Sequence, residues 1–362
     1  MNEQQRELYK LLKRNPYMSK QQLAEALSIS KVKLNALLDQ LENEGAIVGR
    51  AYILKEQKRV VAIGGANIDR KFYVEGGVQF ATSNPSYMTE SVGGVARNIS
   101  ENLSRLQYDV KLLSVIGHDQ AGAVIEQASG GIDFQLTEKL VGYRTGSYTA
   151  VLNEMGELVI AMADMAIYEL LTPALLQRHE SILTSATGIV IDLNCAKQTI
   201  EYVQTLCLHH QIPLAVIPVS VPKMRHMPEQ LEGITYFICN EEELEGYLQT
   251  TFENDFALNG AVEQLLERGA EHVIITLGER GAIAGTKKQI AHYRAYPVDT
   301  IKDVTGAGDA FVSGVLHGVM QGELFDEAVQ LGLANAAATL QSQYTVRVDL
   351  TKKRLSHWRK QY

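Results

Sequence analysis

The segment from Asp303 to Asp309 (DVTGAGD) has the residue types that phosphoryl chemistry needs. A Gly-Ala-Gly turn at the start of an apolar helix leaves backbone N–H groups unpaired, and the helix dipole adds positive potential, so the turn can hold an anion. A carboxylate directly after it can take the proton from a hydroxyl that attacks a phosphoryl group. An Asp at this place also stabilises a helix N-terminus without any catalysis. The turn alone therefore leaves both interpretations open.

Two glycine-rich turns accompany this segment. The first is Gly64-Gly65-Ala66-Asn67-Ile68-Asp69, at the end of a buried apolar run, and the second is Gly93-Gly94-Val95-Ala96-Arg97-Asn98. In this order, the three motifs resemble the signatures of the ribokinase-like (PfkB) carbohydrate and nucleoside kinases, over residues 59–345. The resemblance implies an α/β fold, with a central, mostly parallel sheet flanked by helices and a small β lid.

The resemblance also implies a role for each motif. Asp309 would be the catalytic base, and the N–H groups of Gly306, Ala307 and Gly308 would form the anion hole for the γ-phosphate of ATP. Asp69 would accept hydrogen bonds from two sugar hydroxyls, which suits a carboxylate facing a vicinal diol. The remainder of the sugar pocket would come from Asn67, Gly93, Gly94 and Asn98.

Two segments resemble the nucleotide site of the family. Asn240 and Glu243 match its N-x-x-E segment, which orders magnesium at the triphosphate, largely through water. The acidic run around them also suits a solvated helix face. Thr276, Gly278 and Gly281 match the T-x-G-x-x-G turn that lies against the ATP phosphates.

Three further positions complete the implied ligand sites. Asn335 lies where relatives line the adenine pocket, and Asp303 and Thr305 lie where relatives bind a monovalent cation. The expected cofactors are therefore ATP and Mg²⁺, with K⁺ as a third.

The lid and pocket segments narrow the substrate. The segment Ala81-Thr82-Ser83-Asn84-Pro85 resembles pseudouridine kinases more than ribokinases, which carry Lys where this chain has Val95. The segment Ile191–Asn194 resembles the same subgroup, so Asp192 and Asn194 would contact the ligand or its phosphate surroundings. Relatives often have Asp where this chain has Ile217, which counts against a full match. We expect 5′-phosphorylation of pseudouridine, with another nucleoside or a free sugar as the alternative.

Strand and helix patterns alternate beyond residue 58, which predicts a parallel sheet covered on both faces. The expected strands are 59–65, 111–115, 188–192, 214–217, 236–238 and 272–277, and the expected helices include 96–106, 173–179 and 261–268. Residues 147–152 and 157–162 predict a hairpin around Asn153–Gly156. Asp164, which follows that hairpin, is expected to face the substrate pocket.

The first 58 residues differ from the rest in charge. They carry ten Lys and Arg against seven Asp and Glu, whereas the whole chain has a net charge of −8. Leu8, Leu11 and Leu12 predict a first helix, and Ser19 and Ser30 predict N-caps of two more. Short strands are expected at 46–48 and 51–54. This order resembles the winged-helix domains of bacterial regulators, and implies such a domain over residues 1–57 and a kinase domain over residues 58–362.

The N-terminal domain has basic residues where DNA contacts are expected. Lys31 and Lys33 begin the third helix, and Arg50 lies at the expected wing tip, although Asp39 and Glu42 follow on the helix. We expect residues 1–57 to bind DNA as part of a homodimer, because the charge of a single copy is modest. The alternatives are a dimerisation or packing module, or a transcription regulator that uses the kinase fold as a ligand sensor.

Several other classes are excluded by absent patterns. The sequence has no G-x-x-x-x-G-K-[ST] phosphate loop, no paired C-x-x-C cysteines and no zinc-type spacing among its nine His. It has no signal-peptide-like N-terminus and no apolar run that would span a bilayer, so we expect a cytoplasmic protein with no membrane partner.

Overall fold

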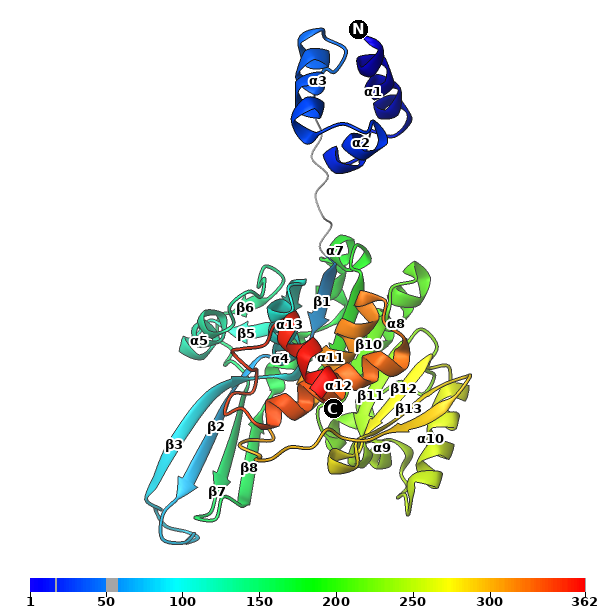
Figure 1. Ribbon diagram of the computed structural model, residues 1–362. Helices are drawn as coiled ribbons and strands as arrows, with labels where there is room; N and C mark the ends of the chain where they lie inside the picture. The colour runs from blue at the N-terminus through cyan, green and yellow to red at the C-terminus, as the bar shows by residue number, and fades with distance from the viewer. Residues whose placement is uncertain (17, 50–57, 362) are drawn as a thin grey trace. The chain divides into compact units, whose positions relative to one another are not determined.

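The computed structural model describes residues 1–16, 18–49 and 58–361 (Figure 1). The chain divides into two compact units, Met1–Gln57 and Lys58–Tyr362. Arg50 and the expected second wing strand, 51–54, lie outside the described residues. No helix in the described part of the chain combines the length and apolarity needed to cross a membrane.

The N-terminal unit contains three helices, α1 (Glu3–Arg14), α2 (Lys20–Ala26) and α3 (Lys31–Asn43). The predicted N-caps are confirmed, because Ser19 accepts from the backbone N–H of Gln22 and Ser30 accepts from that of Lys33. These caps satisfy N–H groups that a helix start leaves unpaired. Residues 46–49 form no strand. The helices enclose a small leucine core, made of Leu8, Leu23, Leu34, Leu37, Leu38 and Leu41.

The larger unit is built on an eight-stranded sheet whose order is β14-β13-β12-β11-β10-β9-β1-β4. The strands from β4 to β12 are parallel, and β13 and β14 add an antiparallel edge. The bounds in sheet order are β14 (Ile290–Tyr293), β13 (Ala282–Thr286), β12 (His272–Thr276), β11 (Tyr236–Asn240), β10 (Leu214–Ile217), β9 (Gly188–Asp192), β1 (Arg59–Ile63) and β4 (Asp109–Leu113). The predicted mostly parallel sheet is therefore confirmed.

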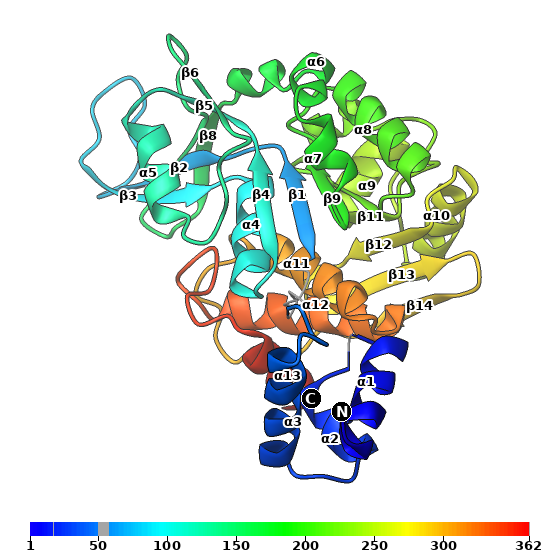
Figure 2. The ribbon, with the colours of Figure 1, turned by 90° about the horizontal axis from the view of Figure 1, so that it is seen from above.

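Helices cover both faces of this sheet (Figure 2). One face packs against α4 (Val95–Arg105), α11 (Ala307–Gln321), α12 (Phe325–Leu340) and α13 (Lys352–Gln361). The other packs against α6 (Pro173–Gln177), α7 (Glu180–Thr184), α8 (Lys197–His210), α9 (Glu241–Leu248) and α10 (Asp255–Glu267). A sheet that is buried on both faces needs apolar residues at every position, which explains the continuous apolar runs of its strands.

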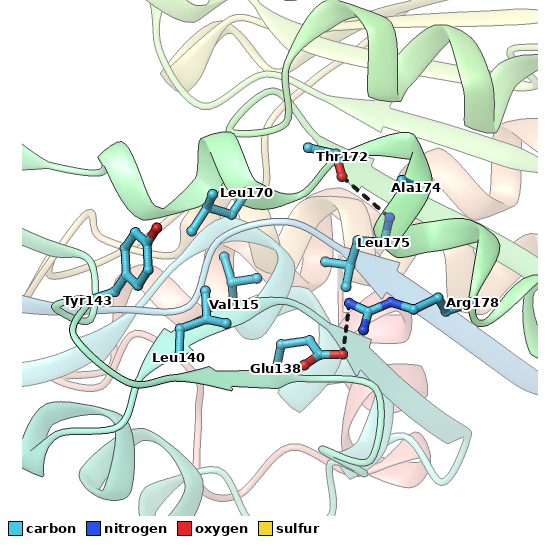
Figure 3. A pocket seen from close by; sticks show the side chains of 9 residues that line it. All are labelled: Val115, Glu138, Leu140, Tyr143, Leu170, Thr172, Ala174, Leu175 and Arg178. Atoms are coloured by element: carbon cyan, nitrogen blue, oxygen red, sulfur yellow. Dashed lines mark hydrogen bonds and ion pairs between the residues drawn. The ribbon is translucent and has the colours of Figure 1, made fainter.

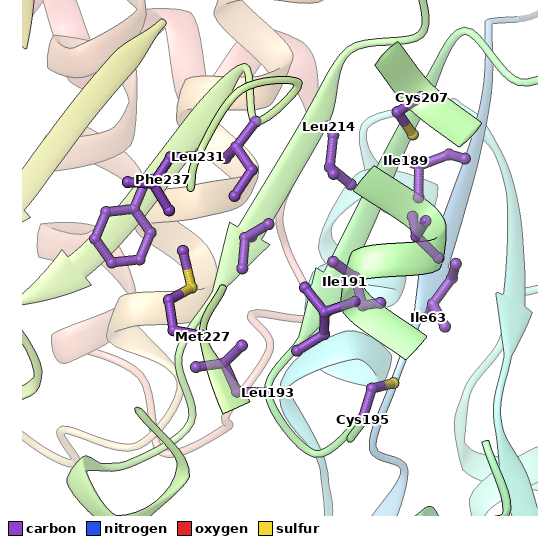
Figure 4. Close-up of a cluster of buried hydrophobic side chains, with 14 of the residues drawn as sticks. Ile63, Ile189, Ile191, Leu193, Cys195, Cys207, Leu214, Met227, Leu231 and Phe237 are labelled. Carbon is purple, nitrogen blue, oxygen red and sulfur yellow. The ribbon is translucent and has the colours of Figure 1, made fainter. Parts of the chain in front are cut away.

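Successive residues of each strand supply the two cores. In β9, Ile189 and Ile191 point into one core, and Val190 between them points into the other. Figure 4 shows Ile189 and Ile191 packed with Ile63 of β1 and Leu214 of β10. Three short 3₁₀ helices, η1 (Ala166–Leu170), η2 (Val221–His226) and η3 (Gly278–Arg280), and a small sheet of β5 (Val115–Gly117) and β6 (Glu138–Leu140) fill the connections.

A second sheet of four strands extends from this body as the lid (Figure 1). Its order is β3 (Ser86–Gly93), β2 (Asn67–Val74), β7 (Ser147–Leu152) and β8 (Leu158–Asp164), with α5 (Gln120–Ala128) beside β2 and β3. The predicted hairpin is confirmed as β7 and β8. The sequence pattern missed β2 and β3, and β2 carries both Asn67 and Asp69.

Candidate active site

The anion turn lies where α11 begins. Gly306 is the N-cap of α11 and has a φ of +81°, which favours glycine. A Cβ at Gly306 would lie 2.2 Å from the backbone oxygen of Thr345, so space as well as φ demands glycine. The turn places the N–H group of Gly308 at the start of a fifteen-residue helix, where the helix dipole favours an anion. The N–H group of Ala307, also expected in the anion hole, donates to the backbone oxygen of Val304 over 3.3 Å.

Asp309 stands in the first turn of α11 and is held by a residue from α4. The side-chain amide of Asn98 donates to Oδ2 of Asp309 over 2.8 Å. The pKa of Asp309 is raised to about 7, mainly by burial and to a smaller extent by the nearby carboxylates Asp192 and Asp69, although the hydrogen bond from Asn98 lowers it. A carboxyl group with a pKa near neutrality is suited to general-base catalysis.

Arg97 is a site residue that the sequence reasoning missed. Its buried guanidinium donates to Oδ1 of Asn98 over 2.9 Å and to Oγ of Ser129 over 2.8 Å, and it pairs with buried Glu101 one helical turn later. Because Arg97 occupies the amide oxygen of Asn98, the amide nitrogen is turned toward Asp309. The available signal was an Arg and a Glu four residues apart on α4, directly beside the second glycine-rich turn.

The two glycine-rich turns are joined by Asp192 at the end of β9. Its fully buried carboxylate accepts from the backbone N–H groups of Gly65 (2.8 Å), Ala96 (3.0 Å) and Asn194 (2.9 Å). A Cβ at Gly64 would lie 2.2 Å from Cγ of Asp192. The expectation that Asp192 contacts the ligand or its phosphate surroundings is corrected here, because its carboxylate is fully buried and bonded to three backbone N–H groups. For the side chain of Asn194 the expectation stays a prediction.

Asp69 lies on β2, where that strand leaves the body of the molecule. Its Oδ1 accepts from the side-chain amide of Asn67 over 2.6 Å, and burial raises its pKa to about 6. Gly93, opposite Asn67 on β3, leaves room for this carboxylate, because a Cβ there would lie 2.1 Å from Oδ2 of Asp69. Gly94 follows as the N-cap of α4 with a φ of +99°. The structure thus groups the expected sugar ligands Asn67 and Asp69 on one face of the lid.

Asp164 is not part of this group. It is the last residue of β8, directly opposite Ser147, which is opposite Ile68. Paired residues share a face of a sheet and successive residues alternate, so Asp164 lies on the face opposite to Asp69. Its side chain is exposed. The expectation that Asp164 faces the pocket is therefore wrong.

One cavity of about 180 Å³ brings the catalytic and nucleotide motifs together. Its lining includes Gly306, Gly308, Asp309, Asn240, Glu243 and Thr276. Asn240 and Glu243 also form the capping box of α9: Asn240 accepts from the N–H of Glu243 over 2.8 Å, and Glu243 accepts from the N–H of Asn240 over 2.9 Å. Burial raises the pKa of Glu243 to about 7. The T-x-G-x-x-G segment turns at η3, where Gly278 and Gly281 have φ of +60° and +94°.

Asn335 takes a place other than the one expected. It is fully buried in α12, where its amide donates to the backbone oxygen of Ala310 over 2.8 Å and accepts from Arg347 over 3.1 Å. Its side chain supports the first turn of α11 from behind, so it is not open to an adenine ring.

Asp303 and Thr305, the expected K⁺ ligands, are bonded to a lysine of the lid. The Lys71 ammonium lies 2.9 Å from Oδ2 of Asp303 and 3.2 Å from Oγ1 of Thr305. Burial alone would raise the pKa of Asp303, but the hydrogen bonds from Thr305 and Lys71 outweigh it and hold this pKa below its usual value.

A larger pocket, of about 460 Å³, lies elsewhere, between β5, β6 and η1 with α6 (Figure 3). Its walls are mainly apolar, with Leu140, Leu170 and Leu175, and Arg178 pairs with Glu138 at 3.2 Å. None of the expected site residues lines it, so it is separate from the chemistry of Asp309.

Comparisons with known proteins agree with this geometry. Residues 57–352 match the pfkB family carbohydrate kinases, and residues 1–48 match winged helix-turn-helix DNA-binding domains. An uncharacterized sugar kinase (YeiI) of Escherichia coli K12 is 31% identical over 339 residues, which cover 93% of each chain. The pseudouridine kinase of E. coli K12 is 27% identical and the guanosine-inosine kinase of Exiguobacterium acetylicum 28%, covering 82% and 78% of this chain and 95% of each relative.

A solved carbohydrate kinase from Agrobacterium tumefaciens has the same fold. It is 30% identical, with a TM-score of 0.73, and the match covers 84% of this chain and 97% of that one. The expected ribokinase-like fold is confirmed. The chain therefore belongs to the pfkB family, as a sugar or nucleoside kinase that transfers a phosphoryl group to an alcohol, and it carries a winged helix-turn-helix domain at its N-terminus.

Proposed function

We propose that the chain is an ATP-dependent kinase for the 5′-hydroxyl of a nucleoside, and that pseudouridine is its substrate. The observation that carries this proposal is the cavity that joins Asp309 to the Gly306–Gly308 turn and to Asn240, Glu243 and Thr276. A positioned base beside an anion-binding turn meets the main needs of phosphoryl transfer, which are alignment and charge stabilisation.

Asp309 acts as the base in this mechanism. Its carboxylate takes the proton of the 5′-hydroxyl as that oxygen attacks the γ-phosphorus, and the bond from the γ-phosphorus to the β,γ-bridging oxygen breaks to release ADP. The N–H groups of the Gly306–Gly308 turn and the dipole of α11 stabilise the charge on the phosphoryl oxygens.

Asp69 positions the sugar. Its carboxylate, oriented by the amide of Asn67, accepts from two ring hydroxyls. Because both residues belong to β2, closing of the lid over the sugar would carry them with it and exclude water from the phosphoryl group.

Magnesium fits this cavity through one buried carboxylate. The described residues contain no group of three His, Cys, Asp or Glu side chains suited to a metal. Glu243, fixed by its capping box with Asn240, would hold Mg²⁺ with the help of water and the phosphates. The ion would neutralise the β- and γ-phosphate oxygens. Thr276, Gly278 and Gly281 would line the path of the triphosphate.

The choice of pseudouridine rests on the lid loop. Residues 81–85 lie in the loop between β2 and β3, and Asn84 holds this loop by bonding to the backbone N–H and oxygen of Gln79, each over 2.8 Å. The similarity to a pseudouridine kinase supports this choice, and the similarity to a guanosine-inosine kinase supports another nucleoside as the alternative. The similarity to a sugar kinase keeps a free sugar as a further alternative.

The test is ATP turnover with Mg²⁺ against pseudouridine, uridine, inosine, cytidine, ribose and fructose. Asp309→Asn is the blank, since it keeps the shape of the site and removes the base. We expect turnover of pseudouridine that is lost in the variant. Turnover of another compound alone would reassign the substrate. Absence of turnover, with a ligand that still raises the melting temperature, would favour a regulator that uses the kinase fold as a sensor.

We also propose that the N-terminal unit binds DNA. Lys31, Lys33 and Asn35 are exposed along the amino-terminal half of α3, the helix that enters the major groove in this motif. Titration of labelled genomic fragments with the full chain and with Lys31→Glu/Lys33→Glu would test it. Loss of binding in the variant is expected, together with a smaller salt dependence.

A homodimer is proposed through the outer face of the lid, the face opposite to Asp69. Met88, Phe72, Val151 and Ile160 are successive cross-strand partners on this face, and Met88 and Ile160 are about half exposed. Because a two-fold axis brings the same patch of both copies together, these apolar side chains would pack against their equivalents in the second copy. Light scattering should show a dimer, and a monomer for Ile160→Asp.

A further inference from the structure

The lid is tied to the anion turn by an ion pair between Lys71 and Asp303. Lys71 lies on β2 two residues after Asp69, so both side chains are on the same face of the lid. The Lys71 ammonium lies 2.9 Å from Asp303 and 3.2 Å from Thr305, which are 232 and 234 residues away in the chain. Both partners belong to residues 303–305, here called the strap, which lead directly into the Gly306–Gly308 turn.

The side-chain oxygens of Asp303 and Thr305 already have partners. Oδ1 of Asp303 accepts from the N–H of Thr305 (2.9 Å) and from its hydroxyl (2.7 Å), and Oδ2 accepts from Lys71. The hydroxyl of Thr305 donates to Asp303 and accepts from Lys71, which is the full use of its proton and one of its lone pairs. The carboxylate of Asp303 is therefore paired with the positive charge of Lys71.

A monovalent cation does not fit this arrangement. It would need the same side-chain oxygens of Asp303 and Thr305. It would also place a second positive charge directly beside the Lys71 ammonium, which already pairs with Asp303 and whose charge also acts on the carboxylate of Asp69. An ammonium group carries the same single charge as K⁺ and is similar to it in size. It can therefore hold the strap in the shape that a bound cation would otherwise hold.

We propose that the Lys71 ammonium takes the place of the monovalent cation at Asp303 and Thr305, so that the kinase works without K⁺. The inference rests on the proposed kinase function. The cation site then becomes part of the lid. Lys71, which fixes the anion turn, lies on β2, and β2 also carries Asp69, the expected sugar ligand.

The experiment compares the full chain with Lys71→Met and with Arg70→Met. Arg70 is the matched control, because it is the adjacent lid residue but lies on the other face and pairs with Glu90. Turnover is measured at constant ionic strength in KCl, NaCl and N-methylglucamine chloride, with the melting temperature measured in the same salts.

The wild-type chain should show equal turnover in the three salts, and Arg70→Met should behave in the same way. The turnover of Lys71→Met should fall by more than about tenfold in the sodium and N-methylglucamine salts, because the variant lacks a stabilising charge next to the anion hole. KCl should restore it. KCl, but not NaCl, should also raise the melting temperature of Lys71→Met and leave that of the wild type unchanged.

Activation or specific stabilisation of the wild type by KCl would overturn the inference. A Lys71→Met variant with no response to KCl in either measurement would overturn it as well. Because melting needs no turnover, a failure of the kinase proposal leaves this outcome readable.

Discussion

The side-chain amide of Asn98 lies 2.8 Å from the carboxylate of Asp309, which is 211 residues away in the chain. This contact connects the first turn of α4 to the first turn of α11. Arg97 fixes the direction of this contact, because it donates to the amide oxygen of Asn98 and leaves the NH₂ group for Asp309. Asn98 was expected to be a sugar ligand. The structure gives it a second role, which is to orient the base and to favour its ionised form.

Asn98→Ala tests this role. Loss of a hydrogen bond to a carboxylate removes about 1.5–3 kcal/mol of stabilisation from the ionised form, which raises the pKa of Asp309 by about one to two units. We expect the acid limb of kcat/KM to move to higher pH by that amount. If Asn98 bound only the sugar, KM would rise and the acid limb would stay in place.

The pH profile of the wild-type chain is a second prediction. The ionised form of Asp309 is the active one and its pKa is about 7, so kcat/KM should fall about tenfold per pH unit below 7. Asp69, with a pKa of about 6, must also be ionised to accept from two hydroxyls, so the slope should steepen below pH 6. Constant kcat/KM from pH 8 to pH 6 would argue against Asp309 as the base.

The apolar runs along the chain were enough to predict six of the eight strands of the main sheet, but not β13 and β14. The strands at Gly188–Asp192 and Leu214–Ile217 have the predicted bounds, because buried parallel strands are continuous apolar runs. The search for apolar runs failed to detect β2 and β3. The lid is solvated on much of its surface, so β2 contains Asp69, Arg70 and Lys71 in a row and has no apolar period to detect.

Contacts between segments that are distant in the chain also could not be predicted from the sequence. The pairing of Lys71 with Asp303 depends on the path of β2 in three dimensions, and no local pattern predicts it. The face of Asp164 depends on the register of β8, which also shifts at Val151/Leu152. A side chain changes face with each single-residue step in a strand, so the position of Asp164 after the hairpin does not by itself determine the face on which it lies.

The glycines of the anion turn give a matched pair of variants. In Gly306→Ala the new Cβ would lie 2.2 Å from the backbone oxygen of Thr345, and the residue would keep a φ of +81°, which disfavours alanine. We therefore expect the free energy of unfolding to fall by about 1–3 kcal/mol. In Gly308→Ala the Cβ meets nothing within 4 Å, and the stability should change little. Urea unfolding of both variants measures this difference. Equal stability of the two would show that the turn relaxes around Gly306.

Asp309→Asn should stabilise the protein, and only above acidic pH. In the wild type, the folded state binds a proton at Asp309 with a pKa of about 7, whereas the ordinary pKa of an aspartate, which applies in the unfolded state, is 3.8. Below pH 3.8 the carboxyl is protonated in both states. Between 3.8 and 7 the folded state alone keeps its proton, so the wild type loses stability as the pH rises, and above 7 the full cost of the buried charge remains.

Asn carries no charge at any of these pH values and avoids that cost. The advantage of Asp309→Asn over the wild type should therefore grow from pH 4 to pH 7 and stay constant above it, with an upper limit of about 4 kcal/mol. Melting curves at pH 4, 6 and 8 measure it, with the exposed Glu263→Gln as the control. A variant that is less stable than the wild type at pH 8 would mean that the ionised carboxylate is held by more than the amide of Asn98. The burial that raises the pKa of Asp309 would then not be the dominant influence on the base.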